Sequence, residues 1–138
     1  MESIFIRSLL DNATNYLIDT NILIYHTTGS KESSDILKNA ITQQSFNISI
    51  ITKIEFLGWD KHTVDGFEKC KKLIESATIY SLGHDIAEKA IQIKKEKKIK
   101  LADAVIAATA ILNNLVLVTR NTDDFKEVLE LKVINPFE

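Results

Sequence analysis

The sequence predicts an α/β fold with a mostly parallel central sheet. Apolar, β-branched runs of strand length alternate along the chain with helical patterns, as in sheets whose parallel strands are joined by helices. The strand-like runs are continuously apolar, which is expected where helices cover both faces of a sheet. The 138 residues include one proline and four glycines. No Pro/Gly-rich linker therefore divides the chain, and we expect a single domain over residues 1–138.

Four short apolar runs are expected to form buried strands, and a fifth, weaker run is a further candidate. Their length and β-branched content distinguish them from helices. The four runs cover residues 16–18, 46–51, 78–82 and 115–119, and the weaker run covers 132–134. The predicted sheet therefore has four to five strands.

Between these runs, apolar residues recur at helical spacing. The predicted helices cover residues 33–42, 64–76, 85–98, 102–113 and 123–130. In the helix over 85–98 we expect Ile86, Ala90 and Ile91 to face the core. The helix over 102–113 is apolar on nearly every face, so we expect its first turn to be buried as well.

Composition and charge exclude several classes of protein. Hydrophobic residues make up 45% of the chain and charged residues 26%, which excludes a disordered chain. The net charge is −2, so bulk attraction to nucleic acid is not expected. A single cysteine, Cys70, excludes an intramolecular disulfide and a cysteine zinc cluster. The sequence lacks a signal-peptide pattern and a run of roughly 20 apolar residues. We therefore expect a cytoplasmic protein with no membrane association.

Acidic residues follow the predicted strands. In parallel sheets, ligands bind beyond the carboxyl ends of the strands. Asp19 follows the first predicted strand, and Glu55 lies shortly after the second. Asp123 and Asp124 follow the fourth, and Asp103 lies in the first turn of the apolar helix. We therefore expect carboxylates from four distant parts of the chain to meet at one edge of the sheet.

Most of these acids also have a purely structural explanation. Asp19 is a favourable N-cap for a helix that starts near residue 21. Thr52 and Glu55 have the spacing of a capping box, in which Glu55 accepts the backbone N–H of Thr52. Asp123 and Asp124 suit the positive end of a helix. These explanations are open alternatives to a functional role for each residue taken singly.

Asp103 is harder to explain by local structure, because its sequence neighbours are apolar and an unpaired buried carboxylate is costly. Converging carboxylates also repel one another, and a divalent cation relieves this repulsion. Ligand sets made only of oxygen select hard ions such as Mg²⁺ or Mn²⁺. Such an ion polarises a phosphate and activates a bound water. The acids therefore suit metal-assisted hydrolysis of phosphodiester bonds.

Four segments of the chain resemble the motifs of PIN-domain ribonucleases. The motifs follow one another along the chain as they do in that family. They are residues 16–25 (YLIDTNILIY), 50–58 (IITKIEFLG), 100–110 (KLADAVIAATA) and 117–125 (LVTRNTDDF). The resemblance covers about residues 15–138, and the length and motif style are similar to VapC-like toxins of bacterial toxin–antitoxin pairs. It implies a three-layer α/β/α sandwich and cleavage of RNA that depends on Mg²⁺ or Mn²⁺.

The resemblance also implies a role for each matching residue. The catalytic acids and metal ligands would be Asp19, Glu55, Asp103 and Asp124. Asp124 stands directly before the phenylalanine of the last motif, with Asp123 as the alternative. Asn121 stands where some family members carry an aspartate. The residues that would support the acids are Asn21, Thr119, Asn121 and Asp123.

A basic run over residues 94–100 leads to Asp103. A solvated helix end is the more common role of such a run, and a strip that contacts phosphates is the functional alternative. The candidate RNA contacts are Lys53, Lys97, Lys98, Lys100 and Arg120.

The resemblance implies protein partners as well. Toxins of this type usually form dimers, and a cognate antitoxin silences them by covering the acidic site with its tail. We expect residues 1–15 to be an atypical N-terminal extension, since family members commonly begin their first strand within a few residues of the start.

Two other functions are open at this point. The chain fits a non-catalytic PIN-like module that binds RNA or protein, with the acids acting as caps, and Asn121 favours this alternative. A phosphotransfer domain with Asp19 as the nucleophile is the second. The haloacid-dehalogenase pattern would, however, require an aspartate where Asn21 stands.

Overall fold

The central sheet has five strands in this computed structural model, which describes residues 15–137. The strands are β1 (Tyr16–Ile18), β2 (Phe46–Ser49), β3 (Thr78–Tyr80), β4 (Val116–Val118) and β5 (Val133–Ile134). They lie in the order β3-β2-β1-β4-β5, and every pair of neighbours is parallel. The chain builds outward from β1 to β3 and then returns to the other side of β1. The carboxyl ends of β1 and β4 therefore form the switch point of the sheet. The predicted N-terminal extension lies outside the described residues, apart from Asn15.

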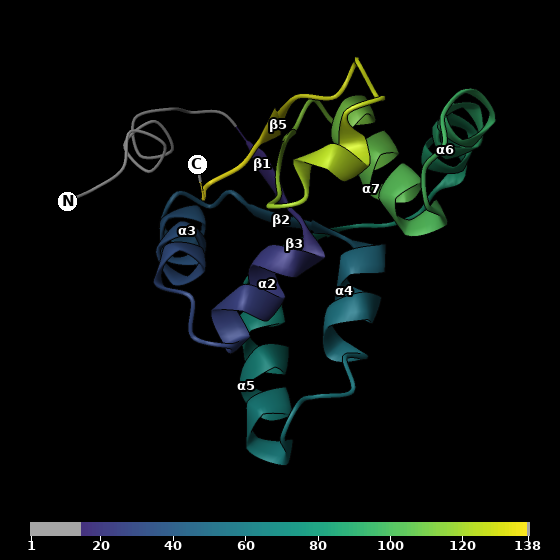
Figure 1. The fold of residues 1–138 in the computed structure, drawn as a ribbon. Helices are drawn as coiled ribbons and strands as arrows, with labels where there is room; N and C mark the ends of the chain where they lie inside the picture. The colour runs from purple at the N-terminus through teal and green to yellow at the C-terminus, as the bar shows by residue number, and fades with distance from the viewer. Residues whose placement is uncertain (1–14, 138) are drawn as a thin grey trace.

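Helices connect the strands and cover both faces of the sheet (Figure 1). They are α2 (Thr20–Thr27), α3 (Lys31–Thr42), α4 (Ile50–Leu57), α5 (Val64–Glu75), α6 (His84–Glu96), α7 (Leu101–Leu112) and the short 3-10 helix η1 (Thr122–Phe125). Within residues 15–137, we find no helix with the length and apolar character needed to cross a membrane.

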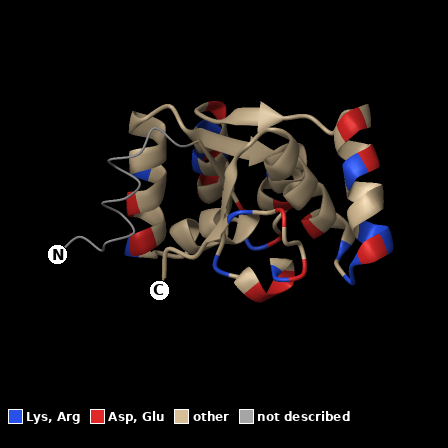
Figure 2. Cartoon of the chain, turned by 90° about the horizontal axis from the view of Figure 1, so that it is seen from above, with Lys and Arg blue, Asp and Glu red and all other residues tan. Residues whose placement is uncertain are grey.

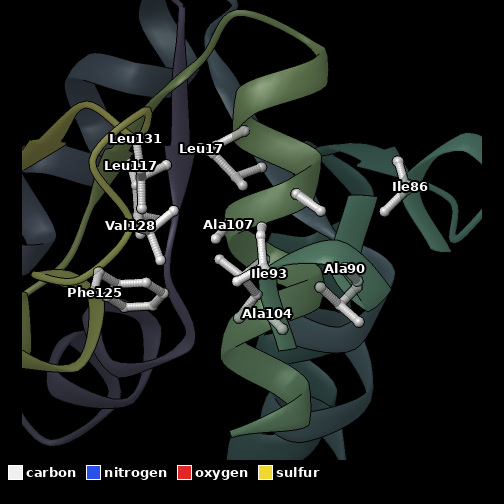
Figure 3. Packing of buried hydrophobic residues seen from close by; sticks show 14 of the residues in the cluster. Leu17, Ile86, Ala90, Ile93, Ala104, Ala107, Leu117, Phe125, Val128 and Leu131 are labelled. Atoms are coloured by element: carbon white, nitrogen blue, oxygen red, sulfur yellow. The ribbon is translucent and has the colours of Figure 1, made fainter. Parts of the chain in front are cut away.

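Two hydrophobic cores flank the sheet, because side chains alternate between its faces along each strand. Leu17 and Leu117 face the core that α6, α7 and the segment after η1 complete. Figure 3 shows Leu117 on one side of this core and Ala107 of α7 opposite. Ile18 and Val118 face the second core, which α2 to α5 complete. The predicted three-layer α/β/α sandwich with a parallel sheet is therefore confirmed.

The second strand ends earlier than predicted. The expected strand over 46–51 stops at Ser49, whose hydroxyl accepts a hydrogen bond from the backbone N–H of Ile51 at the start of α4. Thr52 is therefore inside α4, and the capping box predicted for Thr52 and Glu55 is wrong. The β-branched isoleucines favour a strand locally, but the cap at Ser49 starts a helix there.

The predicted helix over residues 123–130 is also wrong. The chain forms only η1 there, and this short helix ends at Phe125. Phe125, Val128 and Leu131 are all buried against α7 and its neighbours. Their regular spacing resembles that of a helix. In this segment, however, the three buried side chains come from the end of η1 and from the turns that follow it.

The buried stripes of α6 and α7 also differ from prediction. Ile93 is buried together with Ile86 and Ala90, whereas Ile91 is 52% exposed. In α7 the buried stretch covers residues 104–110, and Leu101 is 68% exposed. The first turn of α7 therefore lies nearer the surface than predicted, with Leu101 exposed and Asp103 only partly buried.

Candidate functional site

Asp19 lies at the switch point of the sheet, directly after β1. Its backbone N–H donates to the carbonyl oxygen of Val118 in β4 (3.0 Å). Its side chain caps α2, since Oδ1 accepts the backbone N–H of Thr20 (2.8 Å). Oδ2 accepts the hydroxyl of Thr119 (2.7 Å) and the side-chain amide of Asn21 (3.3 Å). Asp19 is therefore the N-cap of α2, and the residue is 5% exposed at the centre of the candidate site.

Burial dominates the electrostatics of Asp19. Burial raises the pKa of this carboxyl from its usual 3.8 to about 6. The hydrogen bonds from Thr119 and Thr20 lower the pKa, whereas the negative charges of Asp103 and Glu55 raise it. The neutral donors therefore fail to offset the loss of water and the repulsion from neighbouring acids.

Asp103 couples to the remaining acids from the first turn of α7. Partial burial raises its pKa, and the negative charges of Asp124 and Glu55 raise it further. Lys100, at the N-terminal boundary of α7, lowers it. Through Asp103 and Asp19, carboxylates from four distant segments interact electrostatically, as the sequence predicts.

Glu55 is an exposed residue of α4, and Thr20 holds its carboxylate. The hydroxyl of Thr20 donates to Oε1 of Glu55 (2.7 Å) and lies 3.1 Å from the hydroxyl oxygen of Thr52. Thr20 thus links two of the acids, because its backbone N–H bonds Asp19 while its side chain bonds Glu55. Thr20 is not among the site residues predicted from the sequence. Its position next to Asp19 is a signal, but its partner is 35 residues away.

The supporting residues form a hydrogen-bonded network around Thr119. The hydroxyl oxygen of Thr119 accepts the side-chain amide of Asn21 (3.1 Å) and the backbone N–H of Asn121 (3.1 Å). Oδ1 of Asn21 in turn accepts the backbone N–H of Arg120 (3.3 Å). Asn21 therefore ties α2 to the segment after β4. Asn121, an exposed residue, takes part through its backbone.

The predicted lysines divide into two groups. Lys53 lies two residues before Glu55 in α4. Residues two apart on a helix do not face each other, so Lys53 lies on a different face of α4 from Glu55. The others lie after α6, where Figure 2 shows basic residues gathered at one end of that helix. A surface depression of about 820 Å³ contains three of the predicted lysines and three of the predicted acids: Lys97, Lys98, Lys100, Asp103, Asp123 and Asp124.

The donor set fits a hard divalent cation with water in its coordination shell. In the part of the chain that the structure describes, no three His, Cys, Asp or Glu residues lie close enough to ligate one ion together. Mg²⁺ usually keeps several waters and binds through one or two carboxylates. The anionic oxygens around Asp19 and Asp103 match this mode of binding, which does not require a tight three-residue cluster.

We expect Thr119→Val to destabilise the protein by about 1.5–3 kcal/mol at pH 8, the usual range for a hydrogen bond to a charged group. At pH 4, where Asp19 is protonated, the loss should shrink toward about 1 kcal/mol, as for a neutral hydrogen bond. Urea unfolding at both pH values measures the difference. Thr78→Val, at an exposed position of β3, is the matched control. An equal loss for Thr119→Val at pH 4 and pH 8 would contradict the expectation.

The three-layer sandwich places carboxylates at the switch point of a parallel sheet, and comparison with known proteins shows which family has this fold. Residues 16–131 match the PIN domain, and the chain belongs to the PIN domain family. This confirms the resemblance to PIN-domain, VapC-like toxins predicted from the motifs.

Several solved structures are similar to this chain. One is a chain of a toxin–antitoxin complex from Klebsiella pneumoniae, with 34% identity, a TM-score of 0.74 and coverage of 90% of this chain and 99% of that chain. A chain of VapBC2 from Rickettsia felis, bound to a promoter DNA fragment, has 22% identity and a TM-score of 0.76, covering 88% and 98%. A chain of FitAcB from Neisseria gonorrhoeae has 22% identity and a TM-score of 0.73, covering 89% and 99%. The two more distant structures share the fold. A search of curated proteins finds no match to the chain.

Proposed function

We propose that the protein is an endoribonuclease that depends on Mg²⁺ or Mn²⁺. The observation that carries the proposal is the buried carboxylate of Asp19, whose pKa of about 6 reflects burial and repulsion from Asp103 and Glu55. A carboxylate in these surroundings gains strongly when a divalent cation binds beside it. Membership of the PIN domain family supports a nuclease.

Each residue of the site has a distinct part in this proposal. Asp19 and Asp103 hold the cation, which polarises the scissile phosphate and lowers the pKa of a water when bound. Glu55 and Asp124 supply the surrounding negative charge. Thr20 orients Glu55 through its 2.7 Å hydrogen bond, so that one acid does not rotate away from the others.

The supporting residues position the acids, and the lysines position the RNA. Thr119 and Asn21 keep Asp19 in one orientation by donating to Oδ2, and Asp123 adds negative charge beside Asp124. Lys97, Lys98 and Lys100 line the same depression as Asp103, where they suit contact with backbone phosphates. Such contacts place RNA without reading its sequence.

Cleavage of single-stranded RNA tests the proposal. Purified protein is incubated with end-labelled RNA in Mn²⁺, in Mg²⁺ and in EDTA. We expect products with metal, none in EDTA, and recovery when excess metal is added back. RNA binding that is equal with and without metal, combined with no cleavage in any metal, would instead favour a binding module.

Metal binding should also be visible as a change in stability. A ligand that binds only the folded state stabilises it by about 2.7 kcal/mol at 100 times its Kd. We expect Mn²⁺ to raise the melting temperature at pH 8 and to lose this effect as the pH falls below about 6, because protons then compete for Asp19. Thermal unfolding across this range, with EDTA as reference, measures it. A shift that persists unchanged at pH 4.5 would place the ion elsewhere.

We further propose that the protein is the cytoplasmic toxin of a type II toxin–antitoxin pair. The similar structure from Klebsiella pneumoniae is a toxin–antitoxin complex, which supports a cognate antitoxin as partner. An acidic site attracts a cationic side chain of such a partner.

A homodimer is supported by a mainly apolar surface groove of about 340 Å³ that includes Leu82, Ile91 and Leu101. Exposed apolar grooves of this kind favour burial in an interface.

A further inference from the structure

Next to the acidic site, one arginine and two aromatic rings form a compact group. The guanidinium carbon of Arg120 lies 4.9 Å from the ring centroid of Tyr25 and 4.6 Å from that of Phe137. The two ring centroids are 5.7 Å apart, with the planes inclined by 62°. Arg120 is exposed and both rings are half-buried. We infer that Arg120, Tyr25 and Phe137 stack an unpaired nucleobase of a single-stranded RNA; the inference rests on the proposed function.

The location of the group favours a role in binding substrate. Tyr25 follows Asn21 by four residues in α2, so their side chains share one face of the helix, about 6 Å apart along its axis. Asn21 bonds both Asp19 and the backbone N–H of Arg120. The aromatic group therefore begins one helical turn from Asn21, whose side-chain amide donates to the central carboxylate of Asp19.

The aromatic group and the lysines flank the acids from different directions. In Figure 1 the C-terminal segment after β5, which carries Phe137, runs toward α3, whereas α6 lies at the opposite side of the molecule. Figure 2 shows the same separation, with the basic end of α6 far from the C-terminal segment. A strand of RNA that crosses the acids thus has phosphate contacts on one side and aromatic faces on the other.

The charge of Arg120 is available to a ligand. Among the described residues, the salt bridges link Lys31 to Asp35, His84 to Glu88 and Lys89 to Glu130, and none includes Arg120. Packing against two rings restrains the guanidinium, and a guanidinium suits a phosphate through its N–H groups and a base through its face. Within residues 15–137, Arg120 is therefore a cation without a carboxylate partner that lies next to the acids.

The chemistry of the group selects single-stranded RNA. Base stacking on aromatic side chains tolerates any sequence, because every base has a π-face. The bases of a duplex are already stacked on each other, so recognition through base faces requires unpaired nucleotides. The acidic surroundings disfavour binding through phosphates alone, which gives the stacking contact a large share of the affinity.

Removal of single bases from the RNA tests the inference. The Asp103→Asn protein, in Mg²⁺, is titrated with a labelled single-stranded RNA and with versions that lack one base at each position in turn. We expect the loss of one or two particular bases to weaken binding by roughly 5- to 150-fold, the range for one stacked base. Because every oligonucleotide keeps the same phosphates, the ratio of affinities reports base contacts alone.

Variants of the group should abolish this ratio. Tyr25→Leu and Phe137→Leu keep apolar bulk but lose the ring, and Arg120→Lys keeps the charge but loses the planar face. In each, the intact and base-free RNAs should bind within about twofold of each other at the sensitive positions. Phe67→Leu is the matched control, because Phe67 is a half-buried ring of α5 that also contacts a cation, Lys71.

Several outcomes would overturn the inference. If the ratio of affinities for intact and base-free RNA is unchanged in the three variants, stacking is excluded. Stacking is also excluded if the variants lose the same affinity for every oligonucleotide. If RNA binding is unaffected but the variants no longer bind a protein partner, the group is a protein interface. The same oligonucleotides, cleaved by wild-type protein in Mn²⁺, separate the two proposals. If cleavage does not depend on any single base, the stacking site is disproved and the proposed nuclease stands. If the protein neither cleaves nor binds the RNA, both proposals are disproved.

Discussion

Asp103→Asn is expected to lower the rate of RNA cleavage roughly 100-fold or more, since a bound metal supplies several kcal/mol of charge stabilisation. The substitution removes one negative charge from the group formed with Glu55 and Asp124, and so weakens metal binding. The side chain is half-buried in the first turn of α7, and asparagine is nearly isosteric. The melting temperature in EDTA should therefore stay the same or rise. Single-turnover cleavage in Mn²⁺ measures the loss.

Asp85→Asn is the matched control for this prediction. Asp85 lies in the first turn of α6, as Asp103 does in α7, and both substitutions remove one acid from the positive end of a helix. Asp85 is exposed and lines a separate surface depression with His84 and Lys89. Cleavage should be unchanged in Asp85→Asn. Equal activity of the two variants would remove Asp103 from the catalytic site.

Asp19→Asn is expected to stabilise the metal-free protein at pH 8 by up to about 3 kcal/mol, because a carboxyl with a raised pKa is costly to keep ionised. Its pKa is about 6 in the folded protein against 3.8 ordinarily. Between these values the folded state binds more protons than the unfolded state, so stability falls as the pH rises from about 4 to about 6. The penalty is complete above pH 6 and absent below about pH 4. The stabilisation by asparagine should follow the same course.

Urea unfolding in EDTA, from pH 4 to pH 8, measures this effect. Asp60→Asn makes the same change in net charge at an exposed turn after α4 and should show no such pH dependence. With Mn²⁺ at roughly 1,000 times its Kd at pH 8 the order should reverse, because only the wild-type protein gains the roughly 4 kcal/mol that the bound metal supplies. A variant that is less stable than wild type at every pH would show that Asp19 serves the fold through its cap on α2.

The order of elements could be predicted from sequence because each depends on local patterns. The strand over residues 16–18 was predicted with its bounds, and the cap by Asp19 follows from the ordinary preference for aspartate at that position. The predictions failed where two local signals competed. Ser49 ends β2 before two isoleucines that favour strands. The buried residues Phe125 and Val128 have the spacing of a helix, although they lie in a short 3-10 helix and a turn.

The chain order of the acids identified the candidate site, but not its internal bonds. Strand ends meet at one edge in any parallel sheet, so Asp19 and the acids after β4 were expected together. The hydrogen bond between Thr20 and Glu55 joins residues on two helices. No local pattern encodes such a contact, since it depends on how α2 and α4 pack.

The fold class, the four candidate acids and the predicted chemistry of an oxygen-only site all follow from local patterns, because periodicity and motif spacing are properties of neighbouring residues. How strongly the acids interact, and which side chains lie beside them, depends on the packing of segments far apart in the chain. The pKa of Asp19 depends on burial and on Asp103, 84 positions away in the chain. The packing of Arg120 against Tyr25 and Phe137 likewise joins three separate segments. Both are long-range effects, which arise from the packed sheet and not from any single element.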